Sequence, residues 1–297
     1  MGVVMQIVKP GIYDIPESVY HSDPVIEPSL SNSIARIILD QSPKHARFAH
    51  VRLNPNQQPK EITAAMDKGS AIHQLILGKG APIQEIKFSD YKKAAAKEER
   101  NACRDAGVIP LLSKDFDIAH ACSTAVLSEM REREECKEFF APGKSEQVMV
   151  WRDRDIWCRA MVDRMPDDPR SPLFDLKGTM MSANPTEWDR RMVRAYRTQD
   201  RFYADGARRL RGNDPAPMRF IVFEMVEPFA VSVMTPGRTL QHIAQDDVQR
   251  AVDIWGRCMK SGVWPGYPHM ATIEAPNWLI RETEEREMRD EMIEEFV

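Results

Sequence analysis

Three short apolar runs, separated by turn-forming residues, limit what this chain can fold into. The runs SEQVMVW (145–151), IWCRAMVD (156–163) and LFDLKG (173–178) have the length and apolar content of β-strands. Residues 152–155 form a hairpin-length link between the first two, and the turn-rich MPDDPRSP (165–172) leads into the third. The pattern therefore predicts three consecutive strands of one sheet.

Helical patterns surround these strands. Residues 62–78 have helical spacing and end at a glycine, while 186–211 and 239–261 each predict one longer helix. Residues 219–235 predict two more strands that turn at Glu227–Pro228. We therefore expect an α/β fold with a central mixed β-sheet flanked by helices.

We expect the whole chain, 1–297, to form a single domain with three parts. Residues 1–62 hold an N-terminal arm and its helices, and the proline-rich stretch 10–28 of this arm is expected to be irregular. Residues 62–261 are the core. Residues 262–297 are a C-terminal extension with an acidic helix.

Composition excludes several classes of protein. No apolar stretch approaches the ~18 residues that a membrane span needs, and the first residues lack the pattern of a secretory signal. The five cysteines are scattered and form no CxxC pair, which favours reduced thiols and a cytoplasmic location. A net charge of -4 argues mildly against a nucleic-acid partner, but an acidic whole does not exclude a basic groove.

The third strand carries the residues that point to chemistry. Side chains two apart in a strand share a face, so Asp175 and Lys177 are predicted to lie together while Leu176 anchors the strand in the core. Asp163 ends the preceding strand, and the return through the turn segment would bring it beside Asp175. Paired carboxylates and a backbone carbonyl suit Mg²⁺, and a lysine nearby would offset their repulsion or stabilise a phosphoryl transition state.

Two predicted helices supply further candidates. His73 lies on the same face of the helix over 62–78 as Gly69, where another backbone can approach closely. In the helix over 186–211, Gln199 shares a mostly apolar face with Tyr196 and Tyr203 and therefore needs a polar partner. Its opposite face is basic and could hold DNA or another subunit; the candidates are Arg190, Arg194, Arg197 and Arg201.

Each candidate also has an ordinary structural explanation. Asp175 and Lys177 could be a surface ion pair of little energetic value, and His73 could be a core or surface histidine. Glu146, on the first strand, could equally face solvent. The tyrosines could simply be core residues, and the arginines could be a solvated helix face.

The ordered set of these motifs resembles the RecB-type branch of the PD-(D/E)xK nuclease superfamily, which has a restriction-endonuclease-like core. The residues that carry this resemblance are GSAIH (69–73), Glu146, Asp163, DLK (175–177) and QDRFY (199–203). The flanking segments are similar to those of RecE-like exonucleases of phages and prophages. These segments are SLSNS (29–33), SPKHARF (42–48), FEMVEPFAVSV (223–233), WPGYP (264–268) and APNW (275–278). One departure is Gly178, where a threonine commonly follows the lysine.

The resemblance implies a Mg²⁺ site, at which Mn²⁺ would substitute. Its ligands would be His73, Asp163, Asp175 and the backbone carbonyl of Leu176, with Lys177 catalytic. Glu146 would be a further ligand or a carboxylate just outside the ligand set, and Gln199, Tyr203 and Tyr196 would support the site. No iron–sulfur cluster is expected, because clustered C-terminal cysteines are lacking.

The activity implied is digestion of linear double-stranded DNA by a metal-dependent exonuclease in phage or prophage recombination. Relatives assemble as homo-oligomeric rings and are often paired with a single-strand annealing protein. Two alternatives stay open: a non-catalytic DNA-end-binding or recombination module, and an endonuclease of the same fold.

Overall fold

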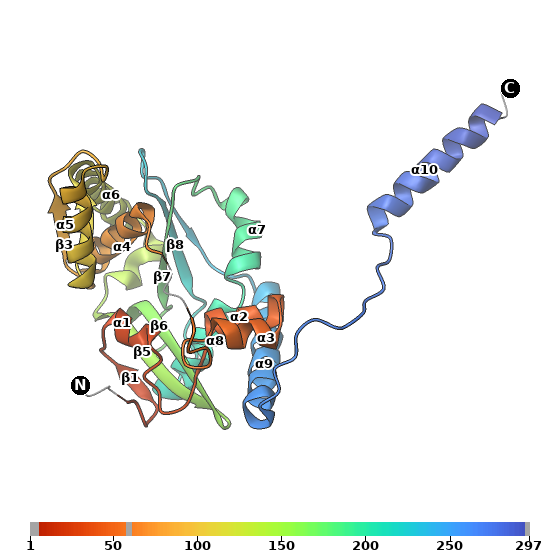
Figure 1. Ribbon diagram of the computed structural model, residues 1–297, viewed down its shortest axis with the longest axis horizontal. Coiled ribbons are helices and arrows are strands. Elements are labelled where there is room, and N and C mark those ends of the chain that lie inside the picture. The colour runs from red at the N-terminus through yellow and green to blue at the C-terminus, as the bar shows by residue number, and fades with distance from the viewer. Residues whose placement is uncertain (1–5, 58–60, 295–297) are drawn as a thin grey trace. The chain divides into compact units, whose positions relative to one another are not determined.

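The computed structural model describes residues 6–57 and 61–294 of the chain (Figure 1). The described residues up to Pro265 form one compact unit, and those from Gly266 onward form a second. The second unit contains helix α10 (Asn277–Glu294), as the acidic C-terminal pattern predicts. None of the helices in the described ranges has the length and apolar character needed to cross a membrane.

The first unit is built on a mixed sheet, which confirms the predicted fold class. In the described residues seven strands pair in the order β1-β5-β6-β7-β8-β9, with β2 added alongside β6. β7 and β8 are parallel, whereas β5, β6 and β7 form an antiparallel run. The strands are β1 (Gly11–Tyr13), β2 (Leu30–Ser31), β5 (Gly143–Asp153), β6 (Ile156–Pro166), β7 (Phe174–Thr179), β8 (Arg219–Glu224) and β9 (Val231–Met234).

Helices pack on both sides of this sheet (Figure 1). One hydrophobic cluster joins the β5, β6 and β8 strands to α2 (Asn32–Asp40), α3 (Pro43–Ala49), α7 (Pro185–Ala195), α8 (Gln199–Arg211) and α9 (Arg238–Ser261). A second joins β7, β8 and β9 to α4 (Ala64–Leu77), α6 (Ser113–Arg131) and the 3-10 helix η1 (Glu134–Phe139). Beside α4 and α6 lies a small parallel sheet of β3 (Ile83–Ile86) and β4 (Ile109–Leu112), joined by α5 (Ala94–Asp105).

The N-terminal arm is more regular than its prolines suggest. β1 pairs with β5, β2 pairs with β6, and between them lies α1 (Glu17–His21). The expectation of an irregular stretch over 10–28 is therefore wrong in part. β1 covers the edge of β5, and a third hydrophobic cluster, which includes Ile15, Tyr20 and Val25 of the arm, covers one face of β5 and β6.

Helix α4 and the β5–β6 hairpin begin, end and turn where local sequence signals predict. The side chain of Thr63 accepts a hydrogen bond from the Met66 N–H at the start of α4, and Gly78 ends the helix in the left-handed region at φ 66°. The hairpin turns at Arg154, whose φ is also positive, at 55°. The apolar pattern predicted that Asp163 ends its strand. This is wrong, because β6 runs on to Pro166 and Asp163 lies inside it.

The segment 186–211 is not one helix. α7 ends at Ala195 and α8 begins at Gln199, with a turn at Tyr196–Thr198. The sequence shows no glycine or proline here, so periodicity alone could not reveal the break. Its consequence is that Tyr196 lies in the turn after α7, whereas Gln199 begins α8.

Candidate active site

The residues predicted to act together do meet, where α4, β6, β7 and α8 come close. Phe174 and Leu176 on β7 are buried in the cluster with α4 and α6, and this turns Asp175 and Lys177 toward α7 and α8. As the sequence predicts, Asp175 and Lys177 share one face of β7 and Leu176 lies on the other.

Asp163 and His73 form a direct pair. His73 Nε2 lies 2.8 Å from Asp163 Oδ2, with side-chain exposures of 26% and 12% respectively. Burial disfavours the charge on the imidazole, but the Asp163 carboxylate outweighs this effect and raises the pKa of His73 to about 9. In the protein without metal, His73 is therefore a cation at neutral pH.

Asp163 also joins β6 to β7. The two strands are paired at Arg164 and Phe174, so the next position in the antiparallel register sets Asp163 opposite Asp175. There the Asp163 Oδ2 accepts a hydrogen bond of 2.7 Å from the Leu176 N–H. A side chain thus takes the place of a ladder bond, and the two carboxylates stand side by side between diverging strands.

Asp175 has two polar neighbours. Its Oδ2 forms an ion pair with Lys177 Nζ, and its Oδ1 accepts a hydrogen bond from Gln199 Nε2. Gln199 is buried at the first turn of α8, so its amide finds its partner in the carboxylate itself. The sequence predicted that Gln199 needs a polar partner, with a metal-bound water, the Lys177 amine or a DNA phosphate as candidates; the partner in the structure is Asp175 instead.

The charges at this site oppose one another strongly. Burial raises the pKa of Asp175. Lys177 lowers this pKa and Asp163 raises it further, so it stays above its usual value. Burial would also raise the pKa of Asp163, but the cation on His73 holds it below its usual value. At Lys177, burial lowers the pKa, but Asp175 and Asp163 outweigh it and keep the amine protonated.

The donor chemistry of this site fits a divalent metal ion. Two buried carboxylates supply hard oxygen ligands, and the buried Asp175 Oδ2 accepts no hydrogen bond apart from its ion pair with Lys177. Among the described residues, however, no three His, Cys, Asp or Glu side chains gather as a ready-made metal cage. A metal would therefore have to replace the pairing between His73 and Asp163.

Glu146 and Glu17 stand at the margin of the site. Glu146 has φ +49° in β5 and is mostly buried; burial raises its pKa and the charge of His73 opposes this. In the described part of the chain it makes no hydrogen bond to His73 or Asp163.

Glu17 on α1 was missed by the sequence reasoning. Its pKa is lowered first by its hydrogen bond with His21 and also by the charge of His73. The local signals of this short helix are Pro16 at its N-cap, Glu17 in its first turn and His21 in its last turn.

The remaining candidates divide between core and surface. Tyr203 is buried in the cluster on α8, and burial raises its pKa well above the usual value for tyrosine. The predicted basic stripe is broken, because it spans α7 and α8. Arg197 pairs with Asp40 and Asp247, and Arg201 pairs with Asp200. Arg190 and Arg194 lie exposed on α7.

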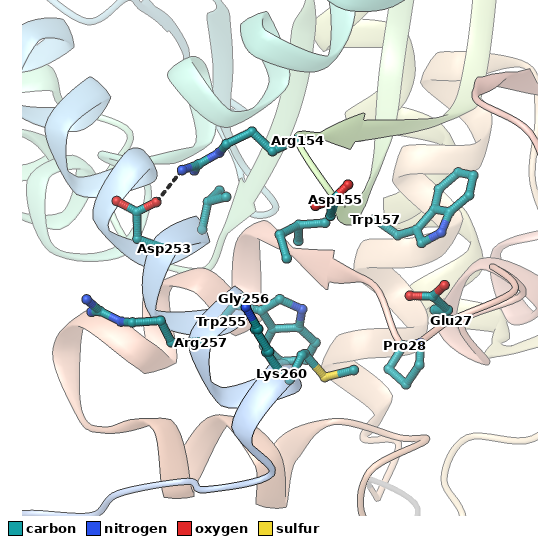
Figure 2. A pocket seen from close by; sticks show the side chains of 13 residues that line it. Glu27, Pro28, Arg154, Asp155, Trp157, Asp253, Trp255, Gly256, Arg257 and Lys260 are labelled. Atoms are coloured by element: carbon teal, nitrogen blue, oxygen red, sulfur yellow. Dashed lines mark ion pairs between the residues drawn. The ribbon is translucent and has the colours of Figure 1, made fainter.

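A cavity of about 630 Å³ lies apart from this site (Figure 2). It is lined by the start of β6 and by α9, whereas Asp163 lies near the other end of β6. Its rim carries both charges, and Arg154 and Asp253 form an ion pair of 2.7 Å across it. None of the predicted site residues lines it.

The family of the chain follows from a comparison with protein-family models. A model described as a PDDEXK-like domain of unknown function (DUF3799) matches residues 38–275, most of the chain. The chain belongs to this PDDEXK-like family. The match includes His73, Asp163, Asp175, Lys177 and Gln199. PDDEXK nucleases generally use divalent metal ions, and a nuclease domain implies DNA as the substrate.

Solved structures agree with the fold of this PDDEXK-like protein. It is similar to a crystal structure from Eubacterium rectale described as a "Putative exonuclease", with a TM-score of 0.51 and 13% identity over 84% of this chain and 90% of that chain. At that identity the likeness concerns the fold. No curated protein matches the PDDEXK-like chain.

Proposed function

We propose that this PDDEXK-like protein is a Mg²⁺-dependent exodeoxyribonuclease that hydrolyses linear double-stranded DNA. The observation that carries the proposal is the meeting of Asp163, Asp175 and Lys177 between β6 and β7, with His73 on one side and Gln199 on the other. Structural ion pairs do not require two adjacent buried carboxylates, one of which has an oxygen, Asp175 Oδ2, with no partner except Lys177.

The residues that would hold Mg²⁺, or Mn²⁺ in its place, are Asp163, Asp175, the Leu176 carbonyl and His73, with Glu146 as a further carboxylate. When bound, the ion would polarise the phosphate and lower the pKa of a water molecule. A histidine ligates only as the neutral imidazole, so metal and proton compete at His73.

The protein's own groups account for the rest of the chemistry. Lys177 places a fixed positive charge next to Asp175, where negative charge builds up on the phosphoryl group under attack. Gln199 holds Asp175 in one rotamer from the opposite direction, with Tyr203 packed behind it in the core. The cation and the carboxylates are thus set before substrate arrives.

The finer assignments rest on the RecE-like resemblance of the flanking segments. They are a role in phage or prophage recombination in the cytoplasm, a homo-oligomeric ring, and a single-strand annealing protein as partner. The proposed DNA contacts of Arg190 and Arg194 are favoured by their exposure on α7, whereas Arg197 and Arg201 are engaged in ion pairs.

The test is a time course on end-labelled linear duplex DNA and on closed circular DNA of the same sequence. We expect Mg²⁺-dependent loss of the linear form only. Asp175→Asn and Lys177→Met should each lower the rate by about 10²–10³-fold while the fold is retained. Asp253→Asn, which removes an exposed ion pair with Arg154, is the matched control and should retain full activity.

Each contrary outcome has a defined meaning. Wild-type rates in both site variants would show that the chemistry lies elsewhere. Binding of linear DNA without cleavage in Mg²⁺ or Mn²⁺ would favour a DNA-end-binding module, and cleavage of closed circles would favour an endonuclease.

A further inference from the structure

The amine of Lys177 is held on two sides. On one side it forms the ion pair with Asp175. On the other it lies over the ring of Tyr196, with Nζ 4.5 Å from the ring centroid, while the ring of Phe220 is 6.0 Å away. The side chain of Lys177 is only 18% exposed, so little water competes for the ammonium group.

The ring of Tyr196 is itself fixed. It stacks on Trp188 with an interplanar angle of 12° and a centroid distance of 6.3 Å. The Trp188 indole donates a hydrogen bond of 2.8 Å to the Ser182 carbonyl. Tyr196 occupies the turn between α7 and α8, where its N–H donates to Met192 and its carbonyl accepts from the Gln199 N–H. The break in the predicted helix therefore aims an aromatic face at the lysine.

An ammonium group over an aromatic face is attracted by the negative face of the ring, and the attraction grows when water is excluded. A four-carbon side chain has many rotamers, and the ion pair with Asp175 restrains only its end. The ring adds a second, broad restraint. Asp175 is also a proposed metal ligand. The contact between Lys177 and the Tyr196 ring therefore matters most when the metal draws the Asp175 carboxylate away from the amine.

We propose that Tyr196 is a positioning residue for Lys177, and that it acts through its aromatic face and not through its hydroxyl. This inference rests on the proposed nuclease function for its catalytic meaning, but the contact itself can be tested without activity. In the described part of the chain the Tyr196 hydroxyl makes no hydrogen bond, whereas the ring contacts Lys177, Trp188 and Phe220.

The first test is structural and uses the full chain without metal. In protein labelled with ¹³C-lysine, the ε-CH₂ signal of Lys177, assigned from its loss in Lys177→Arg, should be shifted upfield by the ring current of Tyr196. We expect Tyr196→Phe to retain this shift and Tyr196→Leu to lose it. Tyr91→Leu is the matched control, since it removes a similar ring–cation contact with Arg100 at 5.0 Å, away from the site.

The second test is kinetic, on linear duplex DNA with Mg²⁺. Tyr196→Phe should keep kcat within about twofold, whereas Tyr196→Leu should lower kcat about tenfold with KM little changed. Tyr91→Leu should match the wild type. If Tyr196→Leu does not fold, Tyr196→Met takes its place, because a flexible side chain fills the space without offering an aromatic face.

The proposal is overturned if the Lys177 signal is unshifted in the wild type, or if Tyr196→Leu keeps wild-type kcat. It is also overturned if Tyr196→Phe loses as much activity as Tyr196→Leu, because the hydroxyl would then be the working group. A wild-type protein with no nuclease activity contradicts the proposed function instead, and the lysine spectrum still decides whether the contact exists.

Discussion

At the scale of single residues, two carboxylates and two cations share one small volume. His73 pairs with Asp163 and Lys177 pairs with Asp175, and all four groups are largely removed from water. Burying ionised groups in this way contributes little net stability, because the loss of hydration offsets most of the attraction. Such an arrangement is typical of a site where charge is kept ready for a ligand.

Metal binding should be measurable from stability alone. Adding Mg²⁺ or Mn²⁺ to the wild type should raise Tm by several degrees, since a ligand at about 100 times its Kd stabilises by about 2.7 kcal/mol. Asp175→Asn should remove this increase, because the negative charge of one proposed ligand is lost. Differential scanning fluorimetry with and without metal measures the shift within each variant. An equal shift in Asp175→Asn would contradict the ligand assignment.

At the scale of elements, α8 is held close to the sheet by a glycine. A Cβ added at Gly206 would lie 2.8 Å from ring carbons of Trp151, which is fully packed in the core. On α9, a Cβ at Gly256 would also come within 2.8 Å of a neighbour, but that neighbour is the terminal Cδ1 of Ile156, which can turn aside. The two glycines therefore differ in what an added methyl group displaces.

We expect Gly206→Ala to destabilise the protein by about 1–3 kcal/mol, because overpacking against Trp151 outweighs the gain in helix propensity. Gly256→Ala should stay within about 1 kcal/mol of the wild type, since alanine favours the helix and only a side-chain end must move. Urea denaturation of both variants measures the difference. Equal stabilities would contradict the close packing of α8.

The N-terminal arm is anchored by the buried carboxylate of Asp23. It accepts hydrogen bonds from the N–H and the hydroxyl of Ser29, lies 3.0 Å from Arg159 Nη1 on β6, and lies 3.3 Å from His50 Nε2. Burial alone would raise its pKa, but His50, Arg159 and Ser29 together lower it below the ordinary value of 3.8.

This lowered pKa predicts that Asp23 contributes to the free energy of unfolding, and that the contribution decreases in acid. The contribution is complete well above pH 3.8, where Asp23 is ionised in both states, and is lost as the pH falls through the lower pKa of the folded state. Asp23→Asn should therefore cost about 3 kcal/mol at neutral pH and less in acid. Denaturation at several pH values measures this, with Asp253→Asn as an exposed control. A pH-independent difference would contradict the ionised state of Asp23.

At the scale of the whole molecule, an acidic protein must bind a polyanion through local charge. The net charge is -4, so long-range attraction to DNA is weak and any basic contacts must be local. Exposed arginines such as Arg190 and Arg194 on α7 and the proposed metal are the candidate sources of positive charge.

DNA affinity should still fall with salt, because released counterions drive phosphate binding. With Ca²⁺ in place of Mg²⁺ to prevent turnover, we expect log K to fall linearly with log salt, with a slope of about -0.9 per phosphate contacted. Arg190→Ala with Arg194→Ala should reduce the slope by about 1 to 2. Fluorescence anisotropy on labelled duplex measures it, and a flat response would argue against DNA as the ligand.

Much of this protein was determined by the sequence alone. The alternation in LFDLKG set Asp175 and Lys177 on one face of a strand, and the hairpin and the capped helix α4 were readable because strand period, turn chemistry and glycine act locally. The tertiary structure decided what depends on contacts distant in sequence. The pairing of His73 with Asp163, the partner of Gln199, the helix break that aims Tyr196 at Lys177, and the arm that brings Glu17 near the site follow from packing, which no local pattern encodes.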